Sequence, residues 1–398
     1  MGEGWDLLNV LRPRVGMPLL GVALSPLLVV GCARRWISHA ILEWSALAIS
    51  ASTLFLLGWV QNPWLPPSDL NQPPALLRTL REDSELFRLF SWAPRVSTYN
   101  VGAYYKGIVG RPPTREFEQR YLRQFIPPNV GMLYDVATVD GYEALQTRRQ
   151  ALLATYIGSE RADYARFASG DGVDAEVYLR SLNDRLNLLA ALNVKYLMHA
   201  FLIEDPRLKP LDEVALTIYQ GLGAVAKVYL YKIETVLPRA FVVPESQVVT
   251  DEKAVLNALA AGSVDLRQRV ILEQEPPALA GDRLTASGST VRVVEYGEDR
   301  VRLEVHTDGS GFLVLMDFLM PGWTATLDGQ PVAVYAANFA GRAVALPVAG
   351  DHHVVFSYEA PLLREGLLVS LLSLLLVVLA PLAWKLRRRC PFPDVRPA

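Results

Sequence analysis

The stretch GLLVSLLSLLLVVLAPLAW, residues 366–384, contains no charged side chain and is followed at once by the basic segment KLRRR, residues 385–389. At the rise of an α-helix this stretch is about 30 Å long, which matches the hydrocarbon core of a bilayer. A basic cluster directly behind an apolar helix is typical of the cytoplasmic side of a membrane. The sequence therefore predicts a C-terminal transmembrane helix over residues 365–385, followed by a cytoplasmic tail, residues 386–398.

Two further apolar stretches lie near the start of the sequence. Val15–Cys32 has no charged residue, Ala40–Val60 has only Glu43, and an arginine pair, Arg34-Arg35, lies between them. A signal peptide is the alternative for the first stretch, but it would end in small residues at a cleavage site. The pattern favours a transmembrane hairpin over residues 15–60, behind an N-terminal tail, residues 1–14.

The two basic clusters beside the spans set the expected orientation. Positive residues next to spans stay in the cytoplasm, which applies to Arg34-Arg35 and to the cluster behind residue 384. Residues 61–364 are then extracytoplasmic. Cys32 and Cys390, the two cysteines of the chain, fall outside this region, so no disulfide framework is indicated there.

The composition excludes several classes of protein. With 51% hydrophobic residues and a formal net charge of -2, the chain is too apolar for a disordered protein and too balanced for a general nucleic-acid binder. The five histidines lack metal-ligand spacing, and no phosphate-binding loop, dinucleotide fingerprint or serine-nucleophile elbow occurs. The sequence therefore identifies no cofactor and no metal site.

Residues 61–276 are predicted to form an extracytoplasmic α/β domain. Asn62–Pro74 is a proline-rich linker, after which helical and strand patterns alternate. Helices are expected over Leu77–Leu86, Arg115–Phe125, Gly141–Gly158, Asp174–Leu192 and Glu252–Ala261. Strands are expected around residues 87–90, 194–198, 216–220, 227–233, 239–244 and 269–273.

Residues 277–364 have a different texture, with short strand patterns and no helical period. The expected strands are Thr290–Tyr296, Arg300–His306, Gly311–Phe318, Thr324–Leu327, Val332–Ala336, Arg342–Pro347 and His353–Tyr358. The Asp-Gly pairs 308–309 and 328–329 are hairpin signals. Strands at this spacing predict an antiparallel β-sandwich. The fold class is thus an α/β outer domain followed by an antiparallel β-sandwich, with three transmembrane helices.

Five short motifs occur in order along residues 85–389. The segment DFLMPGWTATLDG, residues 317–329, is the most specific of them, and PPNVGMLY (127–134), DGY (140–142), LNVKYL (192–197) and LPRAF (237–241) precede it. With the final apolar helix, these motifs resemble the C-terminal portion of the bacterial YfhO-type membrane proteins.

The resemblance implies a multi-pass protein of the bacterial cell membrane, similar to GT-C type glycosyltransferases. Such enzymes move a sugar from a polyprenyl-phosphate donor to an acceptor in the cell envelope. They place a catalytic acid in the first outer loop among many N-terminal spans, whereas this chain has two expected spans before its outer region. The resemblance therefore implies that catalytic helices are missing from this chain, or are supplied by a partner chain. The alternative is a non-catalytic, membrane-anchored binding or assembly protein.

The segment from Asn129 to Tyr142 is the first candidate for contact with a glycan or a lipid-linked sugar. It combines Asn129, Tyr134, Asp140 and Tyr142 on loops, where side chains can bind hydroxyl groups and stack on a sugar ring. The alternative is structural, with Asp140 as a helix cap and the tyrosines buried.

Three residues of the other motifs have mainly structural interpretations. Trp323, after a Pro-Gly turn, is expected to fill the sandwich core, with a sugar-stacking platform as the alternative. Asp317 is expected to cap that turn. Lys195 is expected to snorkel or to pair with a carboxylate.

Overall fold

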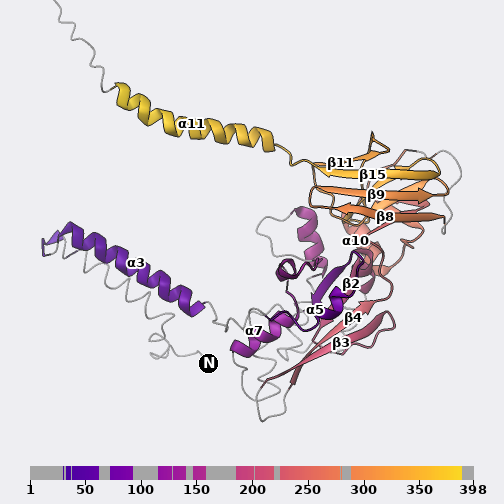
Figure 1. Ribbon diagram of the computed structural model, residues 1–398, viewed down its shortest axis with the longest axis horizontal. Helices are drawn as coiled ribbons and strands as arrows, with labels where there is room; N and C mark the ends of the chain where they lie inside the picture. The colour runs from indigo at the N-terminus through magenta and orange to yellow at the C-terminus, as the bar shows by residue number, and fades with distance from the viewer. Residues whose placement is uncertain are drawn as a thin grey trace, which may run out of the picture.

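The computed structural model describes residues 30, 33–36, 38–61, 72–92, 115–127, 129–139, 147–157, 185–200, 202–218, 225–277, 279 and 288–387. Within them the chain is a mixed α/β protein whose strands form three sheets, mostly antiparallel (Figure 1). The six-stranded sheet is the central layer, because its two faces contribute to two different hydrophobic clusters.

The four-stranded sheet has the order β1-β2-β4-β3. Its strands are β1 (Arg88–Trp92), β2 (Val194–His199), β4 (Val225–Ile233) and β3 (Leu208–Thr217). Successive side chains of a strand point to opposite faces. Accordingly Leu89 packs in a cluster with helices α5 (Leu77–Arg81) and α7 (Arg115–Gln124), whereas Phe90 packs in the cluster shared with the six-stranded sheet. Strands β3 and β4 pair antiparallel along most of their length.

The six-stranded sheet contains strands from both sides of residue 277, where the sequence predicts the boundary between the α/β domain and the β-sandwich. Its order is β5-β10-β14-β13-β7-β6. Three strands precede the boundary, β5 (Ala240–Val243), β6 (Glu245–Val248) and β7 (Arg269–Leu272), and three follow it, β10 (Gly311–Leu315), β13 (Tyr335–Ala337) and β14 (Gly341–Leu346). Helix α10 (Glu252–Ala261) joins the parallel strands β6 and β7, and the Asp251 carboxylate caps it by accepting a hydrogen bond from the Ala254 amide.

The five-stranded sheet has the order β12-β11-β15-β9-β8. Figure 1 shows its strands stacked at one end of the molecule: β8 (Ser289–Tyr296), β9 (Arg300–Thr307), β11 (Trp323–Leu327), β12 (Gln330–Val332) and β15 (Gly350–Tyr358). Alternate residues of β9 and β15 are buried in a cluster with residues of β10 and β14, so the five- and six-stranded sheets share a core. As expected for an alternating strand, His352 is buried and His353 is exposed.

The turn predictions have mixed outcomes. Asp328-Gly329 is a two-residue hairpin between β11 and β12, with positive φ at both residues. The hairpin expected at 308–309 is wrong, because β9 and β10 belong to different sheets and the chain crosses between them there. The single strand expected over Val332–Ala336 is likewise divided between β12 and β13, one in each sheet.

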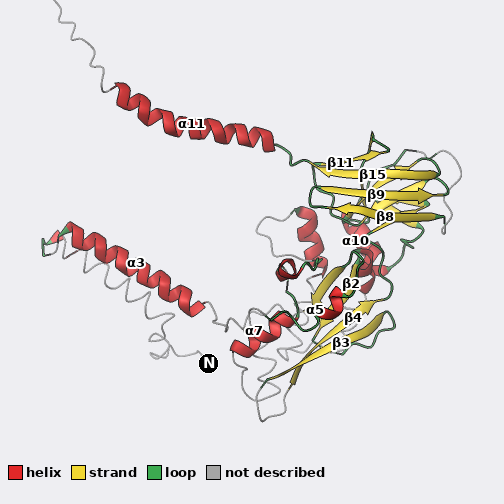
Figure 2. Cartoon of the chain, viewed as in Figure 1, coloured by secondary structure: helices red, strands yellow, loops and turns green. Residues whose placement is uncertain are grey.

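Among the described residues, α11 (Leu363–Arg387) is the one helix long and apolar enough to cross a membrane. Its candidate span, Leu363–Pro381, has 19 residues and none of it is buried against the rest of the chain, which indicates membrane association (Figure 2). Helix α3 (His39–Gln61) forms where the second span is expected, and Ala40–Ser52 is the apolar stretch within its described side chains. The first expected span, Val15–Cys32, lies outside the described residues except for Val30.

Candidate functional site

The carboxylate of Asp317 lies at the centre of a cluster of charged groups drawn from all three sheets. Asp317 follows β10, and its neighbours are Arg88 at the start of β1, Arg239 before β5, Arg342 in β14 and Tyr296 at the end of β8. We call these five residues the Asp317 cluster. Its four charged side chains are largely buried, with 15% of Asp317 exposed, whereas 42% of Tyr296 is exposed.

Arg88 and Arg239 share one oxygen of the carboxylate. Nη2 of Arg88 and Nη1 of Arg239 each lie 2.9 Å from Oδ1 of Asp317. Arg88 also donates to the carbonyls of Leu192 and Met316, and Arg239 donates to the carbonyl of Phe87. The hydroxyl of Tyr296 donates to both carboxylate oxygens, at 2.9 and 3.0 Å. These bonds hold the three sheets together at one point.

Arg342 approaches the carboxylate less closely. Its Nη2 lies 3.7 Å from Oδ2 of Asp317, and its guanidinium stacks on the ring of Trp323, 3.5 Å from the centroid. Trp323 in turn packs against Tyr358, with 5.3 Å between the ring centroids. The Arg342 side chain is only 1% exposed.

Burial and charge shift the pKa values of the cluster in predictable directions. Burial lowers the pKa of Arg88 to about 10, where repulsion by Arg239 adds to the effect and Asp317 opposes it. Burial also lowers the pKa of Arg342 to about 10. For Asp317 burial alone would raise the pKa, but the positive charges of Arg88, Arg239 and Arg342 outweigh it and the pKa is lowered. The carboxylate is therefore ionised at neutral pH.

A cavity of about 440 Å³ opens beside this cluster. Asp317 and Arg342 contribute to its lining, together with the aromatic side chains Phe318, Trp323 and Tyr358. Tyr296, Gly297, Glu298 and Met320 complete it. We call it the Arg342 cavity. Tyr296 separates it from a second cavity of about 530 Å³, whose lining includes Arg239 and Lys195.

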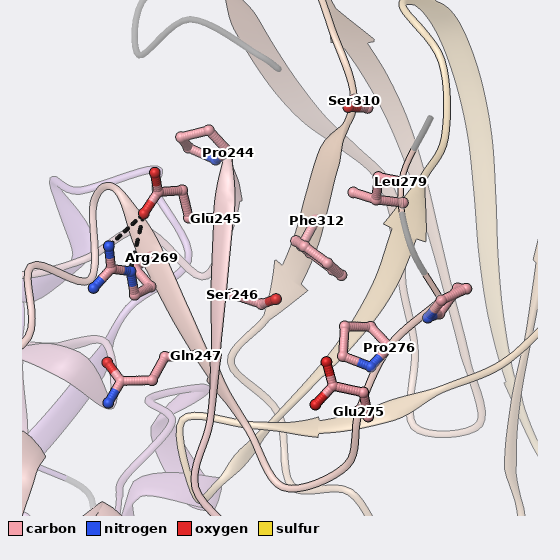
Figure 3. A pocket seen from close by; sticks show the side chains of 11 residues that line it. Pro244, Glu245, Ser246, Gln247, Arg269, Glu275, Pro276, Leu279, Ser310 and Phe312 are labelled. Atoms are coloured by element: carbon pink, nitrogen blue, oxygen red, sulfur yellow. Dashed lines mark hydrogen bonds and ion pairs between the residues drawn. The ribbon is translucent and has the colours of Figure 1, made fainter. Parts of the chain in front are cut away.

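A third cavity, of about 420 Å³, lies between β6 and β10 (Figure 3). Figure 3 shows Glu245 and Arg269 joined on one side and Phe312 and Leu279 on the other. The Arg269 Nε–Glu245 Oε2 distance is 3.0 Å, so these two opposite charges neutralise each other. The Asp317 cluster, by contrast, combines excess positive charge with aromatic walls, and we regard the Arg342 cavity as the candidate functional site.

Among the site residues expected from the sequence, the structure describes Asn129, Tyr134 and Trp323, and the rings of Tyr134 and Trp323 pack on different hydrophobic clusters. Asn129 precedes the 3-10 helix η1 (Val130–Tyr134), and Tyr134 is its last residue. The Tyr134 hydroxyl accepts a hydrogen bond from Arg123, and its ring packs on the cluster around α7. Trp323 instead packs on the core between the five- and six-stranded sheets and lines the Arg342 cavity. Asp140 and Tyr142 lie outside the described residues.

The interpretation of Asp317 as a turn cap is wrong, because its carboxylate is engaged by the arginines and Tyr296. The pairing expected for Lys195 is confirmed, with Asp83 at 2.5 Å and Glu85 at 2.8 Å. Sequence reasoning missed Arg88, Arg239, Arg342 and Tyr296 as site residues. A signal was present for Arg342, since a charged residue inside the buried strand GRAVAL requires a partner.

The described residues contain no group of three or more His, Cys, Asp or Glu side chains that could hold a metal ion. Comparisons with protein-family models, with curated proteins and with solved structures returned no match for this chain.

Proposed function

We propose that this chain is a multi-pass protein of the bacterial cell membrane, related to polyprenyl-phosphate-dependent glycosyltransferases, that contacts an envelope glycan or a lipid-linked sugar. In this proposal residues 61–364 are extracytoplasmic and residues 277–364 contribute to a β-sandwich. The catalytic helices belong to another part of the protein or to a partner chain.

The observation that carries this proposal is the position of the aromatic cavity relative to α11. Tyr358 lines the cavity and ends β15, and the candidate span begins at Leu363. Five residues of extended chain cover at most about 18 Å. The aromatic rings of Trp323 and Tyr358 therefore lie near the expected bilayer surface, where a lipid-linked sugar would be presented. Aromatic rings pack well against the faces of sugar rings.

Topology mapping tests the location. Single cysteines at the exposed positions Thr290 and Thr324, introduced into a Cys32→Ala background, are compared with the native Cys390 in intact cells. We expect a membrane-impermeant maleimide to label both introduced cysteines and to spare Cys390. Labelling of Cys390 alone would place the sheets in the cytoplasm and refute the proposal.

Native mass spectrometry of the full chain, purified in mild detergent from bacterial membranes, tests the ligand class. We expect a co-purifying lipid-linked sugar that is reduced by Tyr358→Ala and unaffected by Tyr335→Ala, a tyrosine outside the lining of the Arg342 cavity. If Tyr358→Ala retains as much lipid-linked sugar as the parent, the sugar does not bind in this cavity.

One observation favours the second candidate, a non-catalytic assembly protein. Met132 and Leu133 of η1 are 74% and 76% exposed, which is unusual for two neighbouring apolar side chains. A photo-activated cross-linker at Met132 that joins this chain to another membrane protein, with no lipid-linked sugar in the purified sample, would favour this function over the first.

A further inference from the structure

The guanidinium of Arg342 lacks hydrogen bonds to the described residues. Its Nε and Nη1 are buried without a partner among them, and Nη2 lies 3.7 Å from Asp317, beyond hydrogen-bond length. Arg88 and Arg239, in contrast, each use both terminal nitrogens. Buried guanidinium groups are normally paired, because the unpaired state is unfavourable. Arg342 therefore has capacity for an acceptor that the described residues do not supply.

The net charge of the site indicates that this acceptor is negatively charged. Three arginines face one carboxylate in the Asp317 cluster, which leaves two positive charges uncompensated. The other carboxylate in the lining of the Arg342 cavity belongs to Glu298, whose side chain is exposed. An anion in the cavity would balance the excess charge. Guanidinium groups bind phosphate particularly well, because two parallel N–H donors match two phosphate oxygens.

The position of the cavity points to the source of the anion. Its lining residue Tyr358 is five residues from the start of the candidate span, and Gly322, beside Trp323, accepts a hydrogen bond from the amide of Glu359. The cavity is therefore tied to the chain segment that leads into α11. Phosphate groups of lipid headgroups are concentrated at that level of a membrane.

We infer that the Arg342 cavity binds a phosphate group, from a lipid headgroup or free in solution, with Arg342 as its main donor. The lipid source rests on the membrane location proposed above. Binding of free phosphate does not depend on that location, so an experiment can refute the proposed function without refuting phosphate binding, and the reverse.

Thermal unfolding of the full chain in detergent micelles tests phosphate binding. We expect inorganic phosphate to raise the Tm, whereas chloride at the same ionic strength does not. In Arg342→Met the phosphate-dependent rise in Tm should vanish, because the main donor to the phosphate has been removed. A phosphate effect that persists in Arg342→Met would overturn the inference.

Two carboxylates outside the core, those of Glu298 and Glu304, provide a test that leaves the core intact, and it decides the matter if Arg342→Met does not fold. Glu298→Gln should tighten phosphate binding roughly two- to five-fold, because it removes a repulsive charge beside the cavity. Glu304→Gln, on β9 and paired with Arg292 outside the cavity lining, should leave the affinity unchanged. Equal affinities for both variants and the parent would refute the site.

Nanodiscs distinguish the two sources. With a lipid that carries no phosphate, such as a galactosyl diacylglycerol, we expect added phosphate to raise the Tm as in micelles. With phosphatidylglycerol present, a lipid phosphate in the cavity should abolish the effect of added phosphate. An unchanged effect would assign the site to free phosphate, and no phosphate effect in either micelles or nanodiscs would overturn the inference.

Discussion

The guanidinium carbon of Arg342 lies 3.5 Å from the centroid of the Trp323 ring and 5.0 Å from that of Phe356. The cation of a six-stranded-sheet residue thus packs against two aromatic side chains of the five-stranded sheet. A desolvated cation–π contact of this kind contributes about 2 kcal/mol. The stack joins the two sheets at the floor of the Arg342 cavity.

Removal of the indole should weaken this junction. We expect Trp323→Leu to lower the free energy of unfolding by about 2–3 kcal/mol, because the half-buried ring loses its contacts with Arg342 and Tyr358. Urea unfolding of the full chain in detergent, followed by near-UV circular dichroism, measures the change. Val348→Ala, at an exposed apolar position, is the control and should have little effect. A loss below 0.5 kcal/mol, roughly that of a surface substitution, would contradict a structural role for the stack.

Loss of the carboxylate at position 317 should be more damaging. Asp317→Asn leaves Arg88 and Arg239 buried without a negative partner, so we expect a loss of about 3–5 kcal/mol in unfolding free energy. Asp351→Asn, which removes an exposed partner of His306, should change stability by less than about 0.5 kcal/mol. If the two variants are equally stable, the cluster does not hold the sheets together.

The contribution of Asp317 should depend on pH. Its folded-state pKa lies below the ordinary value of 3.8, because the arginines outweigh the opposing effect of burial. A group with a lowered folded pKa stabilises the fold above its unfolded pKa, and that stability is lost as the pH falls through the folded pKa. The difference in unfolding free energy between the parent and Asp317→Asn should be constant from about pH 7 to 5 and shrink below about pH 4. A difference that stays constant down to about pH 2 would show that the folded-state pKa of Asp317 is not lowered.

Two glycines with positive φ should respond differently to alanine. At Gly322, with φ 107°, an added Cβ would lie 2.2 Å from the carbonyl oxygen of Glu359, whereas at Gly329, with φ 82°, nothing lies within 4 Å. We expect Gly329→Ala to cost about 1 kcal/mol from backbone strain alone, and Gly322→Ala to cost at least about 3 kcal/mol because the backbone must move as well. The Tm values of the two variants give the comparison, and the reverse order would contradict this geometry.

The apolar character of α11 predicts the response to a charge. Leu374→Arg, at the middle of the candidate span, should disfavour membrane insertion by about 2.5–3.5 kcal/mol, whereas Gly366→Arg near its start should be tolerated. The fraction of the chain that resists alkaline carbonate extraction measures insertion. Equal extraction of Leu374→Arg and the parent would show that α11 is not the main anchor.

The sequence alone determined the local elements. A long uncharged run can only satisfy its backbone in lipid as a helix, so α11 follows from composition. The strand-like residue patterns of 300–306 and 353–358 indicated β9 and β15, in which every second residue faces one core. Both patterns are local, and local physics is sufficient to produce them.

Only the tertiary structure decided which sheet each strand joins. The strand patterns on either side of residue 277 do not predict that β5 and β7 join the same sheet as β10 and β14. Strand pairing depends on contacts between residues that are far apart in the sequence. The candidate site arises in the same way. Arg88, Arg239 and Asp317 come from distant segments and meet because three sheets converge there, and the burial that makes their charges consequential exists only in the fold.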